Sequence, residues 1–276
     1  MFVRNLAVAF ASGVVFVLPG IANAVPATVP NLISHRAVYD LELKDASDRS
    51  GIEGMTGRMV YEFTGSACTG FTSNFRFVTR INTGEETRTT DQQTTNFENP
   101  DTGEFKFDTK SFTDEQLDKE VSGEVKSAES GLKVAITKPD AREIDLVASD
   151  YPTKHMLDVI THAREGKRFF ESRIFDGSED GDKSLLTTTV VGKQETPAGD
   201  DKEAVKAGEF SKTPYWPVTI AYFNENAAGD TSPSYSMSFK LYENGISRGL
   251  TMDYGDFSLS GSLSELTMLD KPSCPQ

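Results

Sequence analysis

The sequence predicts a mainly β protein in which many antiparallel strands form one curled sheet, a β-spiral or broken barrel, with one principal helix. Apolar and polar residues alternate with period two along most of the chain, and turn signals separate these segments at short spacing. Only one segment has helical spacing. We expect about twelve or thirteen strands, and because open twisted sheets rarely exceed about ten, the sheet must curl or close.

Strands with one buried and one solvated face carry apolar side chains at every second position. The clearest examples are residues 71–81 and 235–241, where Phe, Met, Leu, Tyr and Ile alternate with Ser, Thr, Asn, Arg and Lys. Shorter examples lie at 39–43, 59–63, 105–107, 134–136, 144–146, 218–222 and 250–254. Gly- and Asn-rich turn signals lie at 82–84, 99–103, 130–131, 176–177 and 244–245.

Residues 153–165 form the segment that predicts a helix. Pro152 precedes it, Met156 and Ile160 are spaced by one helical turn, and Gly166 follows as a stop signal. A single amphipathic helix is not stable alone in water, so its apolar stripe must pack against the sheet. Two arrangements remain open: the helix only covers the core, or it forms a plug or lid over a cavity.

Residues 1–24 read as a secretory signal peptide. Arg4 gives the positive start, residues 6–18 are almost wholly apolar, and small residues form a cleavage site that ends at Ala24. The apolar run is shorter than the roughly 20 residues that span a bilayer, and no later stretch is long enough. We therefore expect an exported protein that is cleaved after Ala24, has one domain over 25–276 and has no transmembrane segment.

The net charge of the chain limits the classes of molecule that it is expected to bind. The formal net charge is -14, and it becomes -15 when Arg4 leaves with the signal peptide, because no acidic residue leaves with it. A surface this acidic repels nucleic-acid phosphates and anionic lipid surfaces. The sequence therefore excludes nucleic acid as the expected partner.

Cys68 and Cys274 are the two cysteines of the chain. In an oxidising compartment an exported protein with two cysteines normally joins them. The chain-entropy model gives roughly 5 kcal/mol of stabilisation for so long a loop, as an upper value. We expect a disulfide that ties the C-terminal tail to a segment near an early strand.

Ser247 and the three histidines are the candidates for catalysis or metal binding. Ser247 lies in a Gly-x-Ser-x-Gly pattern, but a nucleophile elbow needs a helix after the serine, and the sequence predicts a hairpin turn and a strand there. His155 and His162 are seven apart, about 10 Å along a helix, whereas two ligands of one metal are usually four apart. His155 is interpreted as a packed or capping residue, with a catalytic base as the alternative. His35 has no other histidine or cysteine near it in the sequence. No catalytic residue, metal site or cofactor is predicted.

The acidic segment 176–184 places oxygen ligands at four positions of a calcium loop and glycine at the sixth. Thr187 stands where a bidentate Glu is needed, and the flanking segments are strands, so an ordinary acidic turn is favoured over a calcium site.

Trp216 lies between Pro214 and Pro217, at the start of a predicted strand. It is interpreted as a core anchor, with the lining of a ligand pocket as the alternative.

Several segments together resemble the periplasmic envelope-integrity protein B family of Gram-negative bacteria, across nearly the whole mature chain. They are residues 35–41, 57–63 leading into Cys68, 151–155, 175–178 and 216–223. The resemblance implies a β-spiral, a curled sheet of about fourteen strands with a helix, similar in shape to the lipoprotein carriers of the periplasm, with both cysteines at the family's disulfide positions. It also implies a periplasmic location, a role in envelope integrity, and links to periplasmic proteins that include a tetratricopeptide-repeat protein. The family is not known as an enzyme.

Three functional hypotheses follow. The first is a non-catalytic periplasmic protein that uses a disulfide-locked curled sheet to bind an apolar ligand or a protein partner. The second is a carrier of lipoproteins or lipids, which needs an apolar cavity wide enough for acyl chains. The third is a hydrolase of envelope polymers that works through unrecognised carboxylates.

Overall fold

A computed structural model describes residues 31–224, 232–270, 272 and 274; the predicted signal peptide lies outside these residues. Fourteen strands of the described part form one antiparallel sheet with the order β8-β7-β6-β5-β4-β3-β2-β1-β14-β13-β12-β11-β10-β9. The strands are β1 (His35–Ala46), β2 (Gly54–Ser66), β3 (Gly70–Asn82), β4 (Thr87–Asn99), β5 (Glu104–Thr113), β6 (Gln116–Ala128), β7 (Gly131–Lys138), β8 (Arg142–Leu146), β9 (Phe169–Ile174), β10 (Leu185–Val191), β11 (Tyr215–Phe223), β12 (Tyr235–Tyr242), β13 (Ser247–Asp253) and β14 (Phe257–Met268). The predicted fold class is confirmed.

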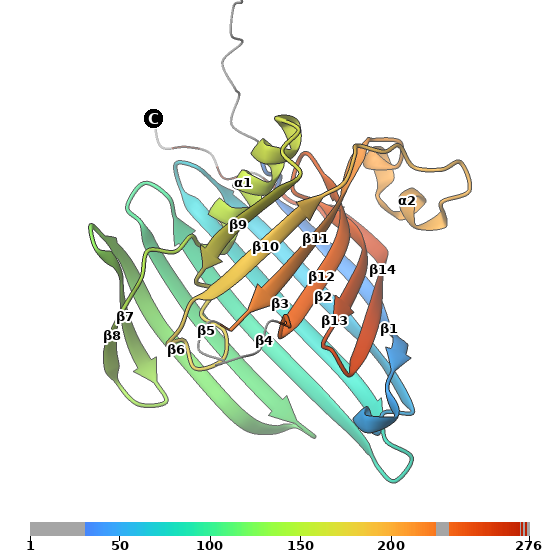
Figure 1. The fold of residues 1–276 in the computed structure, drawn as a ribbon, viewed down its shortest axis with the longest axis horizontal. Helices are drawn as coiled ribbons and strands as arrows, with labels where there is room; N and C mark the ends of the chain where they lie inside the picture. Colours follow the sequence, from blue (N-terminus) through green and yellow to red (C-terminus); the bar gives the residue numbers. More distant parts are fainter. Residues whose placement is uncertain (1–30, 225–231, 271, 273, 275–276) are drawn as a thin grey trace, which may run out of the picture.

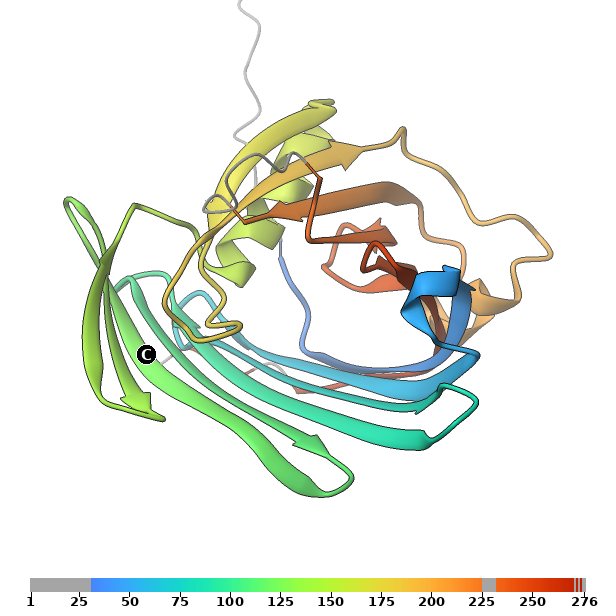
Figure 2. The same cartoon turned by 60° about the horizontal axis from the view of Figure 1, so that its bottom comes forward.

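The count of about twelve or thirteen strands that the alternation predicts is wrong by one or two, whereas the number of about fourteen that the resemblance implies is confirmed. The difference comes from strands such as β4 and β6, which carry polar residues on both faces for much of their length and were not recognised as strands. The sheet curls strongly (Figure 1, Figure 2).

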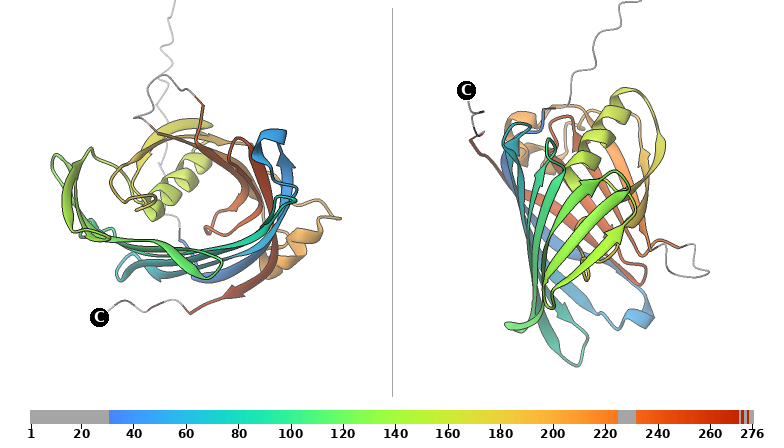
Figure 3. Two further views of the ribbon diagram at one scale, coloured as in Figure 1. Left: turned by 90° about the horizontal axis from the view of Figure 1, so that it is seen from below. Right: turned by 90° about the vertical axis from the view of Figure 1, so that its left-hand side faces the viewer.

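The chain follows a meander that is interrupted once. It runs outward from β1 to β8, crosses through the principal helix to the opposite edge, and returns from β9 to β14, which pairs with β1. The two edges approach each other at one isolated bridge, between Asp150 and Ile174. Because β8 and β9 do not pair, the sheet forms an open spiral and not a closed barrel (Figure 3).

The principal helix α1 (Pro152–Arg164) lies inside the curve of the sheet (Figure 3). Val159, Ile160 and Ala163 of this helix are buried in the main core with side chains from both halves of the sheet. The short helices are α2 (Lys202–Lys206), η1 (Asp48–Ser50) and η2 (Gly208–Phe210). Among the described residues no helix is long and apolar enough to cross a membrane.

The core has two parts, which follow from the alternation of the strands. The main core lies between α1 and the concave faces of β1–β3 and β10–β14. A second core lies under β5–β8 and includes Phe105, Phe107, Tyr151 and Phe175. Phe105 stacks on Tyr151 with ring centroids 4.8 Å apart, so the residue that precedes α1 belongs to this second core.

A buried ion-pair cluster fixes α2 against the outer face of the sheet. Arg248 of β13 is fully buried and donates hydrogen bonds to Asp201 at 2.9 Å and to Glu203 at 3.4 Å. The other carboxylate oxygen of Glu203 accepts hydrogen bonds from the backbone N–H groups of Gly249 and Leu263, each at 2.7 Å. These two groups lie beyond the last pair of the β13–β14 ladder, so Glu203 supplies the acceptor that the ladder lacks there.

Candidate functional site

A cavity of about 290 Å³ lies between α1 and the concave face of the sheet. Its apolar wall comes from alternate residues of strands, which point to the same face because strands have a period of two. The main apolar contributors are Met59, Phe75, Ile220, Met237, Phe239 and, from α1, Met156. The later turns of α1 therefore cover the core and its first turn lines the cavity, so both arrangements that the sequence left open are present.

His35 presents a hydrogen-bond acceptor to this cavity. The residue is buried at 2% exposure, and its Nδ1 lies 2.8 Å from the carbonyl oxygen of Ile33. A carbonyl oxygen only accepts, so Nδ1 carries the hydrogen and Nε2 keeps its lone pair. Burial lowers the pKa of His35, although the bond to Ile33 opposes this, and the ring is therefore neutral at neutral pH.

Two tyrosines add hydroxyl groups to the cavity lining. Burial raises the pKa of Tyr61, and the nearby carboxylate of Glu98 acts in the same direction. Burial also raises the pKa of Tyr222, together with the charge of Asp176. Both phenols therefore stay protonated. Within the described part of the chain neither hydroxyl makes a hydrogen bond, so both are available to a ligand.

His155 lines the same cavity from α1. It is buried, and its Nε2 lies 3.4 Å from the hydroxyl oxygen of Thr189 on β10. Burial lowers the pKa of His155 to about 4, against an opposing contribution from Asp158. The structure thus places His155 as a packed, neutral residue. His162 lies away from the cavity, with its ring 4.5 Å from that of Phe170.

Glu98 is the functional residue that sequence reasoning missed. It lies on β4 at 3% exposure and accepts hydrogen bonds from the backbone N–H groups of Thr153 at 2.8 Å and Lys154 at 3.0 Å. Burial raises the pKa of Glu98, whereas these bonds lower it. Tyr151 at the start of α1 makes no side-chain capping bond, so Glu98 takes that role from another part of the chain. A local pattern cannot reveal such a contact.

Ser247 lines the cavity but is tied to Tyr39, whereas Trp216 lies in the main core. The hydroxyl oxygen of Ser247 is 3.5 Å from that of Tyr39, and its carbonyl oxygen accepts a 2.7 Å hydrogen bond from the same tyrosine. The residues after Ser247 form β13, as predicted, so the strand-to-helix turn of a nucleophile elbow is missing. Trp216 is buried in the main core and does not line the cavity, which agrees with the core-anchor interpretation.

The acidic segment 176–184 is an ordinary turn whose charges are largely paired within the protein. The carboxylate of Asp176 accepts a 2.9 Å hydrogen bond from the backbone N–H of Ser178, as in an Asx turn. Asp180 lies 2.8 Å from Lys119, and this contact lowers the pKa of Asp180. In the part of the chain that the structure describes, no three His, Cys, Asp or Glu side chains are placed to hold a metal ion together.

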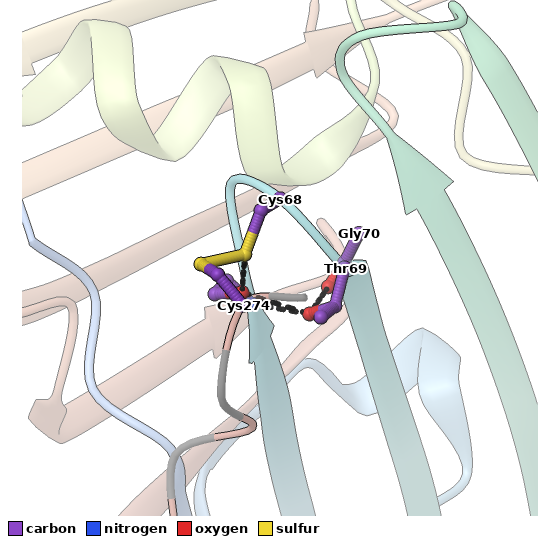
Figure 4. Close-up of a disulfide and its surroundings, with 5 residues drawn as sticks. Cys68, Thr69, Gly70 and Cys274 are labelled. Carbon is purple, nitrogen blue, oxygen red and sulfur yellow. Dashed lines mark hydrogen bonds between the residues drawn. A yellow bond between two sulfur atoms is a disulfide. The ribbon is translucent and has the colours of Figure 1, made fainter. Parts of the chain in front are cut away.

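Cys68 and Cys274 form a disulfide with a Cα–Cα distance of 5.7 Å across 206 positions of sequence. Cys68 lies in the turn between β2 and β3, where the hydroxyl of Ser66 is 3.0 Å from its sulfur (Figure 4). The same hydroxyl is 2.8 Å from that of Thr69, so the turn is ordered by its own side chains. The bond therefore ties the C-terminal tail to a well-defined turn at the rim of the sheet.

Comparison with known proteins gives a consistent relationship. The cell envelope integrity protein EipB of Brucella abortus (strain 2308) is 49% identical over 271 residues, which cover 98% of this chain and 96% of the relative. A crystal structure of a β-barrel-like protein from Brucella abortus, assigned to a domain of unknown function, matches with a TM-score of 0.82 and 49% identity over 87% of this chain and 99% of that one. Residues 26–270 match the EipB-like family, and the chain therefore belongs to the EipB-like family.

Proposed function

We propose that this protein is an exported, non-catalytic protein of the periplasm that supports cell-envelope integrity by binding an apolar ligand inside its curled sheet. The observation that carries the proposal is the cavity between α1 and the concave face, with a wall that is mostly apolar. The name of the relative from Brucella abortus supports the role in the envelope. Residues 1–24 supply the export signal in this proposal.

The size and wall of the cavity fit a small apolar ligand or one chain of a larger one. Ligand pockets are usually about 300–1,000 Å³, mainly apolar, with a few polar groups that orient the ligand. The cavity of about 290 Å³ is close to the lower limit of that range, and most of its wall is apolar. Each buried methylene contributes roughly 0.8 kcal/mol, so a chain of about ten carbons gains enough to offset the cost of association.

The disulfide supports the cavity wall in this proposal. Beyond β14 the backbone N–H of Leu269 donates a 2.9 Å hydrogen bond to the carbonyl oxygen of Ser34, next to His35 in the wall. The same tail continues to Cys274, which is bonded to Cys68. Fixing the tail thus holds the segment before β1 in place at the rim of the cavity.

Binding of the apolar fluorophore N-phenyl-1-naphthylamine tests the ligand part of the proposal. We expect saturable binding by the wild type and loss of binding in Met237→Trp, because the larger side chain fills the cavity. Met268→Trp is the matched control, since Met268 is 37% exposed and does not line the cavity. Native mass spectrometry of protein purified from the envelope should show a bound apolar molecule in the wild type and in Met268→Trp, but not in Met237→Trp.

The envelope role is tested in cells that lack the gene. Wild-type protein and Met268→Trp should restore resistance to detergent, whereas Met237→Trp should not, provided that all three accumulate equally in the periplasm. Failure of the wild type to bind the fluorophore or any lipid would refute the ligand proposal. Full complementation by a folded Met237→Trp variant that binds no fluorophore would separate the envelope role from the cavity.

A further inference from the structure

The charges around the cavity point to a preference among apolar ligands. We propose, on the basis of the ligand-binding function above, that the cavity accepts an aliphatic chain whose polar end is a hydrogen-bond donor, uncharged or cationic, and excludes chains that end in an anion.

The first observation is the sign of the charge. Of the described residues that line the cavity, Asp176 is the one with a formal charge, and no Lys or Arg is among them. A second carboxylate, that of Glu98, lies close enough to Tyr61 in the wall to raise its pKa. A buried anion would meet negative charge and no cation, and unpaired charges are costly to bury. A carboxylate or phosphate end therefore loses its hydration without gaining a cationic partner.

The second observation is the kind of polar atom that is free. Nε2 of His35 is an acceptor, because Nδ1 already donates to Ile33. One oxygen of Asp176 accepts from the backbone of Ser178, and the other oxygen has no partner in the described part of the chain. The hydroxyls of the two lining tyrosines can donate or accept. Among the free groups with a fixed role, Nε2 of His35 and the second oxygen of Asp176 are acceptors, and the side-chain NH2 group of Asn244 is a donor, because its Oδ1 already accepts from Ile246. Buried acceptors are normally satisfied by donors.

A matched set of ten-carbon probes tests the proposal. We would measure how 1-decanol, decylammonium and decanoate displace N-phenyl-1-naphthylamine at pH 7, with each probe below its micelle concentration. Decanol and decylammonium should displace the fluorophore at concentrations at least tenfold lower than decanoate. The variant Asp176→Asn should reduce the preference for decylammonium over decanoate at least threefold. Asp180→Asn is the control, because Asp180 lies on the same turn, pairs with Lys119 and does not line the cavity.

Each outcome separates this inference from the proposed function. Equal displacement by decanoate and decanol, or an unchanged preference in a folded Asp176→Asn variant, would overturn the inference while leaving fluorophore binding intact. Should Asp176→Asn fail to fold, His35→Phe provides a second test: loss of the Nε2 acceptor should weaken decanol binding at least threefold more than it weakens fluorophore binding, and an equal effect on both would count against the inference. Absence of fluorophore binding in the wild type would refute the proposed function itself.

Discussion

The carboxylate of Glu98 accepts a 2.8 Å hydrogen bond from the backbone N–H of Thr153, which lies 55 positions later in the chain. A strand of the sheet thereby supplies the cap that the sequence of α1 does not contain. Because Thr153 and Met156 of the same helical turn line the cavity, this one contact sets the position of a cavity wall. Helix capping is therefore coupled to the geometry of the cavity in this protein.

Replacing Glu98 by Ala should destabilise the protein by about 2 kcal/mol, because two backbone N–H groups at the start of α1 lose their buried acceptor. The measurement is urea unfolding at pH 7. Glu171→Ala is the matched control, since Glu171 is an exposed strand residue and should change stability by less than about 0.5 kcal/mol. Equal stability of the two variants would show that the Glu98 cap contributes nothing.

His155 should make the protein sensitive to acid. Its pKa is about 4 in the folded protein against 6.5 for the free side chain, so its contribution to stability is present above pH 6.5 and is lost as the pH falls toward about 4. The loss is at most on the order of 3 kcal/mol. Urea unfolding at pH 7 and pH 4.5 should show that His155→Gln loses less stability than the wild type.

His162→Gln is the control for the pH experiment, because it replaces the other histidine of the same helix, whose side chain is 26% exposed. Burial of His155 would not be the cause of the acid sensitivity if both variants changed the pH dependence equally. Glu98 acts in the opposite sense: its raised pKa means that its ionisation costs stability as the pH rises. The change in stability between pH 7 and pH 4.5 must therefore be expressed, for each histidine variant, as a difference from the wild type.

Breaking the disulfide should lower the melting temperature by several degrees. The bond closes a loop of 206 positions, for which the chain-entropy model gives about 5 kcal/mol as an upper value. Each kcal/mol corresponds to roughly 2–4 °C in a protein of this size. Cys68→Ser, Cys274→Ser and the reduced wild type should melt together, below the oxidised wild type, in thermal circular dichroism. Identical melting of oxidised and reduced protein would disprove a stabilising bond.

Replacing Glu203 by Ala should cost about 3 kcal/mol, since it leaves two strand N–H groups without an acceptor and removes a partner of the buried Arg248. Glu209→Ala is the control, because Glu209 is exposed in the neighbouring 3-10 helix. Chemical unfolding should separate the two variants clearly. A loss below about 0.5 kcal/mol for Glu203→Ala would mean that water replaces the carboxylate at no cost.

The predicted strands were those with one apolar face. In β12, Met237, Phe239 and Leu241 pack in the main core, as the alternation required. The alternation of apolar residues did not predict strand β4, because its inward positions are polar. Thr90 and Gln92 line a second cavity, and the hydroxyl of Thr90 is 2.7 Å from that of Thr79. A period-two pattern of hydrophobicity is absent where both faces of a strand are polar, so the sequence pattern cannot predict this part of the sheet.

The candidate site was less predictable than the fold. The sequence pointed to α1 and to a possible cavity beneath it, because an amphipathic helix must cover something. It gave no indication that Glu98 would reach the helix or that His35 and Asp176 would face the same space. Those contacts join residues that are far apart in sequence, and only the curl of the sheet brings them together.

The pairing of β1 with β14 gives the disulfide a particular meaning. The first and last strands are neighbours in the middle of the sheet, so the two halves of the protein are joined along a seam that cannot exist before the end of the chain arrives. In the folded protein the Cys68–Cys274 bond lies beyond the end of that seam. Oxidation of this pair therefore records covalently that the C-terminal tail has reached the early turn, and a free Cys68 thiol would identify copies that lack that tail.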